Sequence, residues 1–333
     1  MIDLVIVWTG IIALSVLMYV VMDGFDLGIG ILFPFIRGAR ERDTMIASIA
    51  PVWDGNETWL VMGGAALYAV FPLAYSILLT AFYAPLIVML LALVFRGVAF
   101  EFRFRDERHR RLWDWAFAGG AAVATFSQGV VLGTFVQGIA VEGRSYAGGW
   151  FDWLTPFSLF TGGALMAGYA LLGAGWLVMK TQGDLQARSR RLMRPLAWLV
   201  VVAIAVVSLW TPLVNPAIAA RWFTWPNIAY LSPVPVLAAL GIVALDRAIV
   251  AGREALPFLL ALGLFVLSYL GLGISLFPLV VPPSISIWAA AAPRETLVFF
   301  LVGAAILLPV TLGYTAYVYW VFRGKTAEET TYH

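Results

Sequence analysis

The chain has 333 residues, of which 62% are hydrophobic and 12% are charged, and its mean hydropathy is +0.90. Soluble globular domains carry about 25% charged residues, so this composition excludes an ordinary water-soluble fold and indicates an integral membrane protein. The net charge of +2 gives no reason to expect nucleic acid as a partner, and the absence of cysteine excludes disulfides and thiolate metal sites.

The predicted elements begin with an apolar run at the N-terminus. Met1, Ile2 and Asp3 lead directly into this run without any positive charge. A cleavable signal peptide starts with a positive segment, so we expect the run to stay as the first membrane helix. A spanning helix needs about 20 mainly apolar residues, and the sequence therefore predicts an all-α polytopic membrane protein with nine spans. These cover roughly residues 5–36, 54–74, 76–100, 113–138, 155–180, 194–213, 226–246, 256–280 and 296–322.

Positive charge is distributed unequally between the connections that join these spans. The odd-numbered connections and the C-terminal tail hold 18 of the 21 Lys and Arg residues, and the other side holds Arg144, Arg221 and Arg294. Positively charged loops face the cytoplasm. The N-terminus is therefore predicted to lie outside, and the C-terminus in the cytoplasm.

The histidines limit what this chain can bind. It has two, His109 in an arginine-rich stretch and the terminal His333, and neither lies in an apolar segment. Hemes within membranes are usually held by His, Met, Cys or Tyr ligands. We expect this chain to bind no heme and no metal ion of its own.

The acidic residues at membrane depth belong to the first two spans. Asp23 and Asp26 lie three residues apart on one helix face, and Asp54 and Glu57 repeat this spacing where the second span begins. The two spans run in opposite directions, so all four carboxyls are predicted near the cytoplasmic boundary. Asp23 and Asp26 either line a hydrated proton route or bond to neighbouring helices. Asp54 and Glu57 also fit a capping box, with an acidic N-cap and Glu at the third position.

An arginine-rich segment follows the third span. Arg96 and Glu101 are candidates to pair with the acids of the first two spans, whereas residues 103–111 are predicted to form a solvated run of charge beside the lipid headgroups. Gln128 and Gln137 in the fourth span are expected to form hydrogen bonds between helices rather than to act as ligands.

Three motifs occur at these positions: Asp23-Gly24-Phe25-Asp26-Leu27-Gly28, the segment IAPVWDGNETWL over residues 49–60, and Phe95-Arg96-Gly97 followed by Phe100-Glu101-Phe102-Arg103. As a set they resemble subunit II of cytochrome bd-type quinol oxidases, including the cyanide-insensitive group. The length and the nine-span layout agree with this resemblance along the whole chain.

The resemblance implies two four-helix bundles, within residues 1–140 and 150–285, a peripheral ninth helix within 290–322 and a cytoplasmic tail over 323–333. It also implies a heterodimer in the bacterial plasma membrane, with hemes b and d in subunit I, and the oxidation of quinol coupled to the reduction of oxygen to water. Small single-span accessory subunits and a structural quinone also occur in this family.

In some members of the family, acidic residues of subunit II contribute a route for cytoplasmic protons. The matching positions are Asp23, Asp26 and Asp54, with Glu57 beside them.

Two other functions stay open. A proton-coupled transporter tends to have broken helices and a polar site near the midplane, often in both halves. Pro309 could break the ninth span, but the second half of the chain has no matching charged site. A purely structural scaffold that shields the partner's hemes differs from the first hypothesis only in whether the carboxyls exchange protons.

Overall fold

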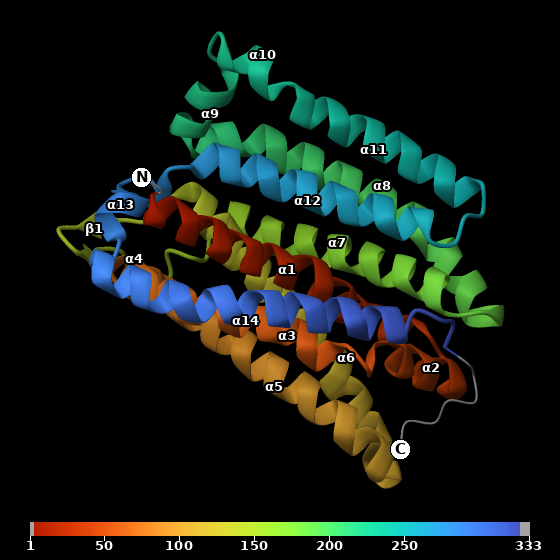
Figure 1. The fold of residues 1–333 in the computed structure, drawn as a ribbon. Coiled ribbons are helices and arrows are strands. Elements are labelled where there is room, and N and C mark those ends of the chain that lie inside the picture. Colours follow the sequence, from red (N-terminus) through yellow and green to blue (C-terminus); the bar gives the residue numbers. More distant parts are fainter. Residues whose placement is uncertain (1–2, 327–333) are drawn as a thin grey trace.

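The computed structural model describes residues 3–326, and its long helices lie side by side (Figure 1). The terminal residue His333 and most of the predicted tail lie outside the described residues. Two short 3₁₀ turns cover Phe33–Phe35 and Glu107–His109. The α-helices are α1 (Leu4–Leu32), α2 (Ala39–Ile49), α3 (Trp53–Val70), α4 (Pro72–Ala81), α5 (Tyr83–Arg105), α6 (Arg110–Gln137), α7 (Pro156–Lys180), α8 (Gly183–Val214), α9 (Pro216–Phe223), α10 (Asn227–Leu231), α11 (Pro233–Val250), α12 (Leu256–Leu276), α13 (Ile287–Ala290) and α14 (Arg294–Val321).

Eight helical segments in the described part are long and apolar enough to cross a membrane, and they contain α1, α5, α6, α7, α8, α11, α12 and α14. The predicted second span corresponds to α3, which has 18 residues but is not among the eight. Asp54, Asn56 and Glu57 lie in its first turns and lower its hydropathy. The prediction of nine spans therefore depends on α3.

Several helix boundaries differ from the prediction. The predicted third span was to start near residue 76, but α4 occupies residues 72–81 and α5 starts at Tyr83. Pro72 starts α4, as expected of a residue with fixed φ and no backbone N–H. The first predicted connection contains α2, and α8 starts at Gly183 rather than near residue 194. Both additional helical stretches are rich in arginine, and hydropathy therefore did not reveal them.

The helices pack around α1 and α7. Helix α1 contacts α3, α6 and α7, while α5 packs on α6, and α7 packs on α6, α8 and α12. A Cβ added to Gly28 would lie 1.8 Å from the carbonyl oxygen of Tyr169, and one added to Gly173 would lie 2.5 Å from the carbonyl carbon of Gly28. Glycine at both positions allows the backbones of α1 and α7 to approach this closely.

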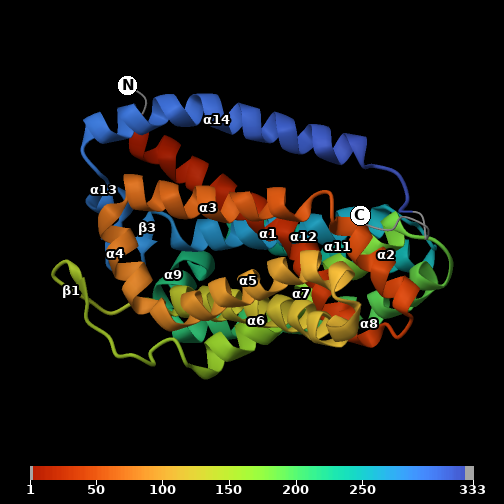
Figure 2. The ribbon, with the colours of Figure 1, turned by 90° about the horizontal axis from the view of Figure 1, so that it is seen from below.

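Figure 2 shows helix α14 on the outside of the molecule along α1 and α3. Most of its side chains are partly or fully exposed. Leu308, Leu312 and Tyr319 pack against a small cluster formed by α1 and α3. Pro309 lies inside α14 without ending it, because the helix continues to Val321. The break that a transporter-like reading considered at this proline is therefore absent from α14.

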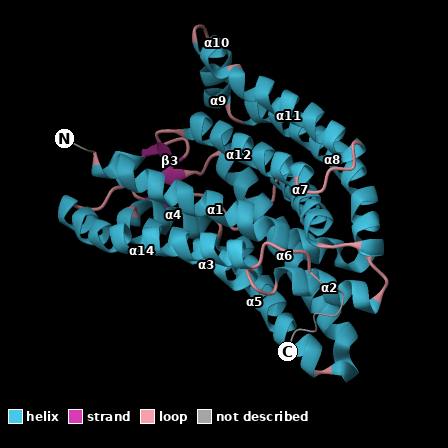
Figure 3. Ribbon diagram, turned by 45° about the vertical axis from the view of Figure 1, so that its right-hand side comes forward, coloured by secondary structure: helices cyan, strands magenta, loops and turns pink. Residues whose placement is uncertain are grey.

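The strands found within residues 3–326 form two short antiparallel hairpins near the end of the molecule that holds the N-terminus (Figure 3). Strand β1 (Val141–Glu142) pairs with β2 (Ser145–Tyr146), and β3 (Leu279–Val281) pairs with β4 (Ile285–Ser286). Residues 3–326 are otherwise helices and connecting segments, as the composition predicts.

Candidate functional site: a buried carboxyl and arginine cluster

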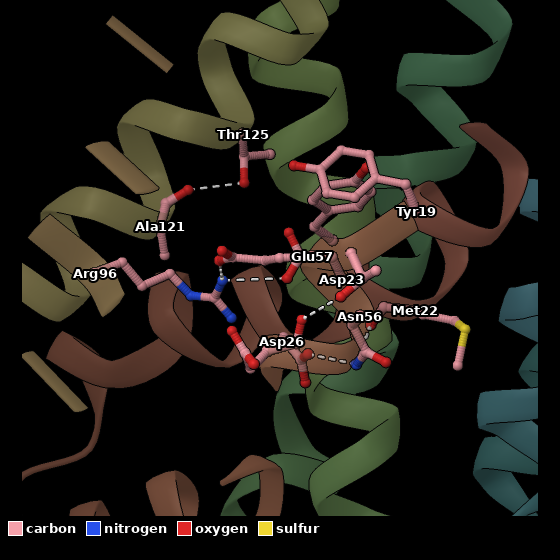
Figure 4. Close-up of polar contacts among 12 residues, drawn as sticks. Tyr19, Met22, Asp23, Asp26, Asn56, Glu57, Arg96, Ala121 and Thr125 are labelled. Carbon is pink, nitrogen blue, oxygen red and sulfur yellow. Dashed lines mark hydrogen bonds and ion pairs between the residues drawn. The ribbon is translucent and has the colours of Figure 1, made fainter. Parts of the chain in front are cut away.

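Buried polar side chains gather where α1, α3 and α5 meet, and Figure 4 shows them pointing toward one another. Asp23 and Asp26 lie in the second half of α1 and expose none of their surface. Arg96 reaches them from α5, is also fully buried, and pairs with acids of the first two spans as predicted.

Arg96 connects acids from two helices. Its Nη1 donates to Asp23 Oδ1 at 3.1 Å and to Glu57 Oε1 at 2.6 Å. The guanidinium also lies 5.7 Å from the centre of the Phe100 ring. A Cβ added to Gly120 of α6 would lie 2.5 Å from the carbonyl oxygen of Ala92 and 3.0 Å from Arg96 Cβ. The small residue on α6 therefore leaves room for α5 to carry Arg96 at this position.

Asp26 belongs to a second arm of the cluster. Asn56 Nδ2 donates to Asp26 Oδ2 at 2.6 Å and lies 3.4 Å from the backbone oxygen of Met22. The hydroxyl of Tyr319 donates to Asn56 Oδ1 at 3.0 Å. These hydrogen bonds connect α1 and α3 to α14. The side-chain amide of Asn56 thus attaches α14 to the site.

A third set of polar groups lies along the same stretch of α1. Gln128 Nε2 of α6 donates to the hydroxyl of Tyr19 at 2.6 Å, and the hydroxyl of Tyr169 donates to Gln128 Oε1 at 3.1 Å. Gln128 thus joins three helices, as expected for an interhelical hydrogen-bonding residue. Gln137 has a similar role, because its Oε1 accepts from Thr155 Oγ1 at 2.6 Å.

Several buried atoms of the cluster have no hydrogen-bond partner within the described residues. They are Asp23 Oδ2, Asp26 Oδ1, and Nε and Nη2 of Arg96. Buried polar groups are usually paired with protein or with ordered water. Unpaired donors and acceptors side by side make this a site that water molecules can hydrogen-bond to.

The structure separates Asp54 from Glu57 and contradicts the capping-box interpretation. Helix α3 starts at Trp53, its N-cap is Val52, and no side chain caps it by a hydrogen bond. Asp54 lies in the first turn with an exposed side chain, whereas the side chain of Glu57 is 23% exposed and turns toward Arg96. The two acids therefore sit at different depths from the surface.

Glu101 does not join the cluster. Its side chain is 50% exposed and pairs with Arg105 at 3.4 Å. The prediction that residues 103–111 form a solvated run was wrong for Arg103, which is 1% exposed. Arg103 pairs with Asp43 at 2.7 Å and Asp114 at 2.6 Å, and so ties α2 to α5 and α6.

The sequence analysis did not assign the uncharged residues to the site, where they form hydrogen bonds with the acids or with one another. Asn56 stands inside the second motif, between two carboxyl residues, and this was the available signal. Nothing in the sequence linked Tyr19, Tyr169 or Tyr319 to the acids, because these contacts are made between helices. Within residues 3–326, no group of three or more His, Cys, Asp or Glu side chains could hold a metal ion.

Comparison with known proteins assigns the chain to a family. Residues 4–322 match the family model described as cytochrome bd terminal oxidase subunit II. The chain is 32% identical to cytochrome bd-I ubiquinol oxidase subunit 2 of Escherichia coli (strain K12), over 97% of this chain and 95% of that protein. It is 28% identical to cytochrome bd ubiquinol oxidase subunit 2 of Bacillus subtilis (strain 168), over 97% and 96%.

The fold has a solved counterpart as well. A chain of the bd oxidase from Geobacillus thermodenitrificans matches with a TM-score of 0.76 at 17% identity, covering 96% of this chain and 99% of that one. The resemblance of the motifs in the first hundred residues is thus confirmed over nearly the whole length. This chain belongs to the cytochrome bd terminal oxidase subunit II family.

Proposed function

We propose that this chain is the heme-free subunit II of a quinol:oxygen oxidoreductase in the bacterial plasma membrane. It supports a subunit I that carries hemes b and d, and it contributes a route by which cytoplasmic protons reach the site of oxygen reduction. Membership of the family supports the first part, because relatives are named as subunit 2 of ubiquinol oxidases. The buried cluster supports the second.

The observation that carries the proton route is a graded series of carboxyls. Asp54 is exposed, Glu57 is 23% exposed, and Asp23 is fully buried. Glu57 and Asp23 share one guanidinium nitrogen of Arg96, at 2.6 and 3.1 Å. A proton taken up at the surface would pass inward from Asp54 to Glu57 and then to Asp23, which contacts the same guanidinium as Glu57.

The balance of charge favours exchange of protons in this cluster. Asp23, Asp26 and Glu57 are three carboxyls, and the guanidinium of Arg96 neutralises one negative charge. Excess negative charge buried in a low-dielectric region is costly, so carboxyls that share such a site bind protons as a group. A set of acids that keeps some of its protons is suited to pass them on.

The exposed face of α3 is the proposed contact with subunit I. Asp54, Val61 and Tyr68 recur at seven-residue intervals and so lie on one side of the helix. Val61 is 69% exposed and Tyr68 is 64% exposed. A carboxyl at the edge of an apolar helix face is expensive against lipid, whereas a partner protein can offer it polar groups. Protons would then enter beside Asp54 at the cytoplasmic end of this face, and the cluster would pass them on to the partner.

We count α3, the predicted second span, together with the eight long apolar helices, which gives nine spans. The N-terminus then lies outside and the C-terminus in the cytoplasm. The asymmetry of Lys and Arg between the connections supports this orientation. We group α1, α3, α5 and α6 as a first bundle and α7, α8, α11 and α12 as a second. The packing of α1 on α3, α5 on α6, α7 on α8 and α11 on α12 supports this grouping, although α1 and α6 also pack on α7, and α14 lies against α1 and α3.

The test uses the whole oxidase complex in proteoliposomes. We expect Asp54→Asn and Asp26→Asn to assemble with a normal heme spectrum and to lose most oxygen consumption. Glu101→Gln is the matched control, because Glu101 is an exposed acid outside the cluster. Normal oxygen consumption in both variants and in the double variant would contradict the proton route. In that case a scaffold role for the cluster would stand while membership of the family remained.

A further inference from the structure

A groove between α8 and α11 has no part in the proposed proton route. It is an open groove with a volume of about 160 Å³, and it is lined mainly by aliphatic side chains. Val200 and Val201 of α8 form one wall, Ile242 and Val243 of α11 form the other, and Leu264 of α12 lines the groove as well. Helices α8, α11 and α12 lie side by side in Figure 1, with α11 on the outside of the molecule. The groove therefore opens on the side away from α1 and its acids.

One end of this groove is polar. Asp246 and Arg247 line it there, close to the last turn of α11. Arg194 Nε donates to Asp246 Oδ1 at 2.9 Å, so a positive charge balances this carboxylate. The exposed guanidinium of Arg247 has no partner within the described part of the chain. A positive charge without a counter-charge thus lies at one end of the aliphatic groove.

A membrane interface is the expected setting for this end. It lies beside the connection between α11 and α12, which the distribution of Lys and Arg along the chain predicts to face the cytoplasm. Trp198 lines the groove one turn after Arg194 and is 53% exposed. Indole rings favour the headgroup region, so Trp198 marks its depth. An arginine in the last turn also complements the helix dipole, but this role alone requires no groove.

We propose that this groove binds one anionic phospholipid. The acyl chain lies along Val201 and Val243, and the phosphate pairs with the guanidinium of Arg247. The aliphatic walls match a hydrocarbon chain, and the unpaired positive charge at their polar end favours a headgroup with net negative charge over a zwitterionic one. A quinone would fill the trough but would leave Arg247 without a counter-charge.

The test measures the lipid retained by the purified complex. The complex is equilibrated with equal amounts of phosphatidylglycerol and phosphatidylcholine that have the same acyl chains, and the bound lipid is counted by native mass spectrometry. A single arginine near the headgroups changes affinity for an anionic lipid about fivefold, so Arg247→Gln should lower the retained ratio by about that factor. Arg253→Gln is the matched control, because Arg253 is also exposed but does not line the groove.

A second variant tests the trough without changing charge. Val243 is 49% exposed, so Val243→Trp can fill the groove while the fold is kept, and one lipid of either headgroup should be lost. Glycerol phosphate, which has a headgroup but no acyl chain, should not displace the lipid. The proposal is overturned if Arg247→Gln keeps the wild-type ratio, if glycerol phosphate competes fully, or if the retained molecule is a quinone.

Discussion

Replacing Arg96 with methionine tests whether the buried charges depend on one another. The side chains of Arg96 and Asp23 expose none of their surface, and Arg96 Nη1 lies 3.1 Å from Asp23 Oδ1. Without the guanidinium, a buried carboxylate remains without its counter-charge. Breaking a buried ion pair in this way costs about 3–5 kcal/mol.

This cost converts into a shift that can be measured. With an unfolding entropy of about 2.1 cal/mol/K per residue, a chain of 333 residues loses about 4–7 °C of melting temperature. The assay is thermal unfolding of the purified complex, monitored by the loss of its helical circular dichroism. Arg105→Met is the matched control, because Arg105 is 79% exposed and its pair with Glu101 at 3.4 Å is worth only a few tenths of a kcal/mol.

The double variant Arg96→Met with Asp23→Asn separates charge from packing. It removes both members of the fully buried pair and leaves Glu57, whose side chain is 23% exposed and can turn toward water. We therefore expect the double variant to regain most of the lost melting temperature without regaining oxygen consumption. The reasoning is refuted if Arg96→Met melts like the Arg105→Met control, or if the double variant melts lower than Arg96→Met alone.

Three further outcomes are expected. Gly28→Ala should prevent stable assembly, because its Cβ would lie 1.8 Å from a backbone oxygen of α7, whereas Gly10→Ala on the same helix meets nothing within 4 Å; the yield of intact complex measures the difference. Tyr319→Phe should cost about 1 kcal/mol by losing its hydrogen bond to the site, measured by thermal unfolding. The hydrogen bond from Lys325 lowers the pKa of the exposed Glu254 below its ordinary value of 4.5, so the contact stabilises the docked C-terminal segment above that pH and is lost as the pH falls through the lowered pKa. The amide protection factors of this segment, corrected for the intrinsic pH dependence of exchange, should then fall in acid, but not in Glu254→Gln, which lacks the contact at every pH.

The sequence predicted the membrane character and the acids of the first two spans, because hydropathy and intramembrane carboxyls are visible residue by residue. It placed Asp23 and Asp26 on one helix face, which the structure confirms. It could not show that Arg96 is buried, because burial of that residue depends on the small Gly120 of a different helix. It also misjudged Arg103, whose partners Asp43 and Asp114 come from other helices.

The predicted helix boundaries were wrong for a related reason. Hydropathy detects apolar segments, and it does not detect helices that carry many charges. Helix α2 and the first turns of α8 are rich in arginine and project beyond the apolar part of the chain. Their helical structure comes from packing and ion pairs, such as Arg188 with Glu41 at 3.1 Å, which link segments far apart in the sequence.

The cost of the carboxyl cluster bears on its role. A hydrophobic group of similar volume often replaces a buried ion pair with no loss of stability, and sometimes with a gain. This chain instead places Asp23, Asp26 and Arg96 in a fully buried position and leaves polar atoms of all three without a protein partner in the described part. Packing alone gives no reason for such an arrangement, because aliphatic side chains would hold α1 and α5 together more cheaply. Groups that must bind and release protons cannot be replaced by aliphatic side chains. The free-energy cost of burying these carboxyls is therefore an argument that they act in the reaction that the complex performs.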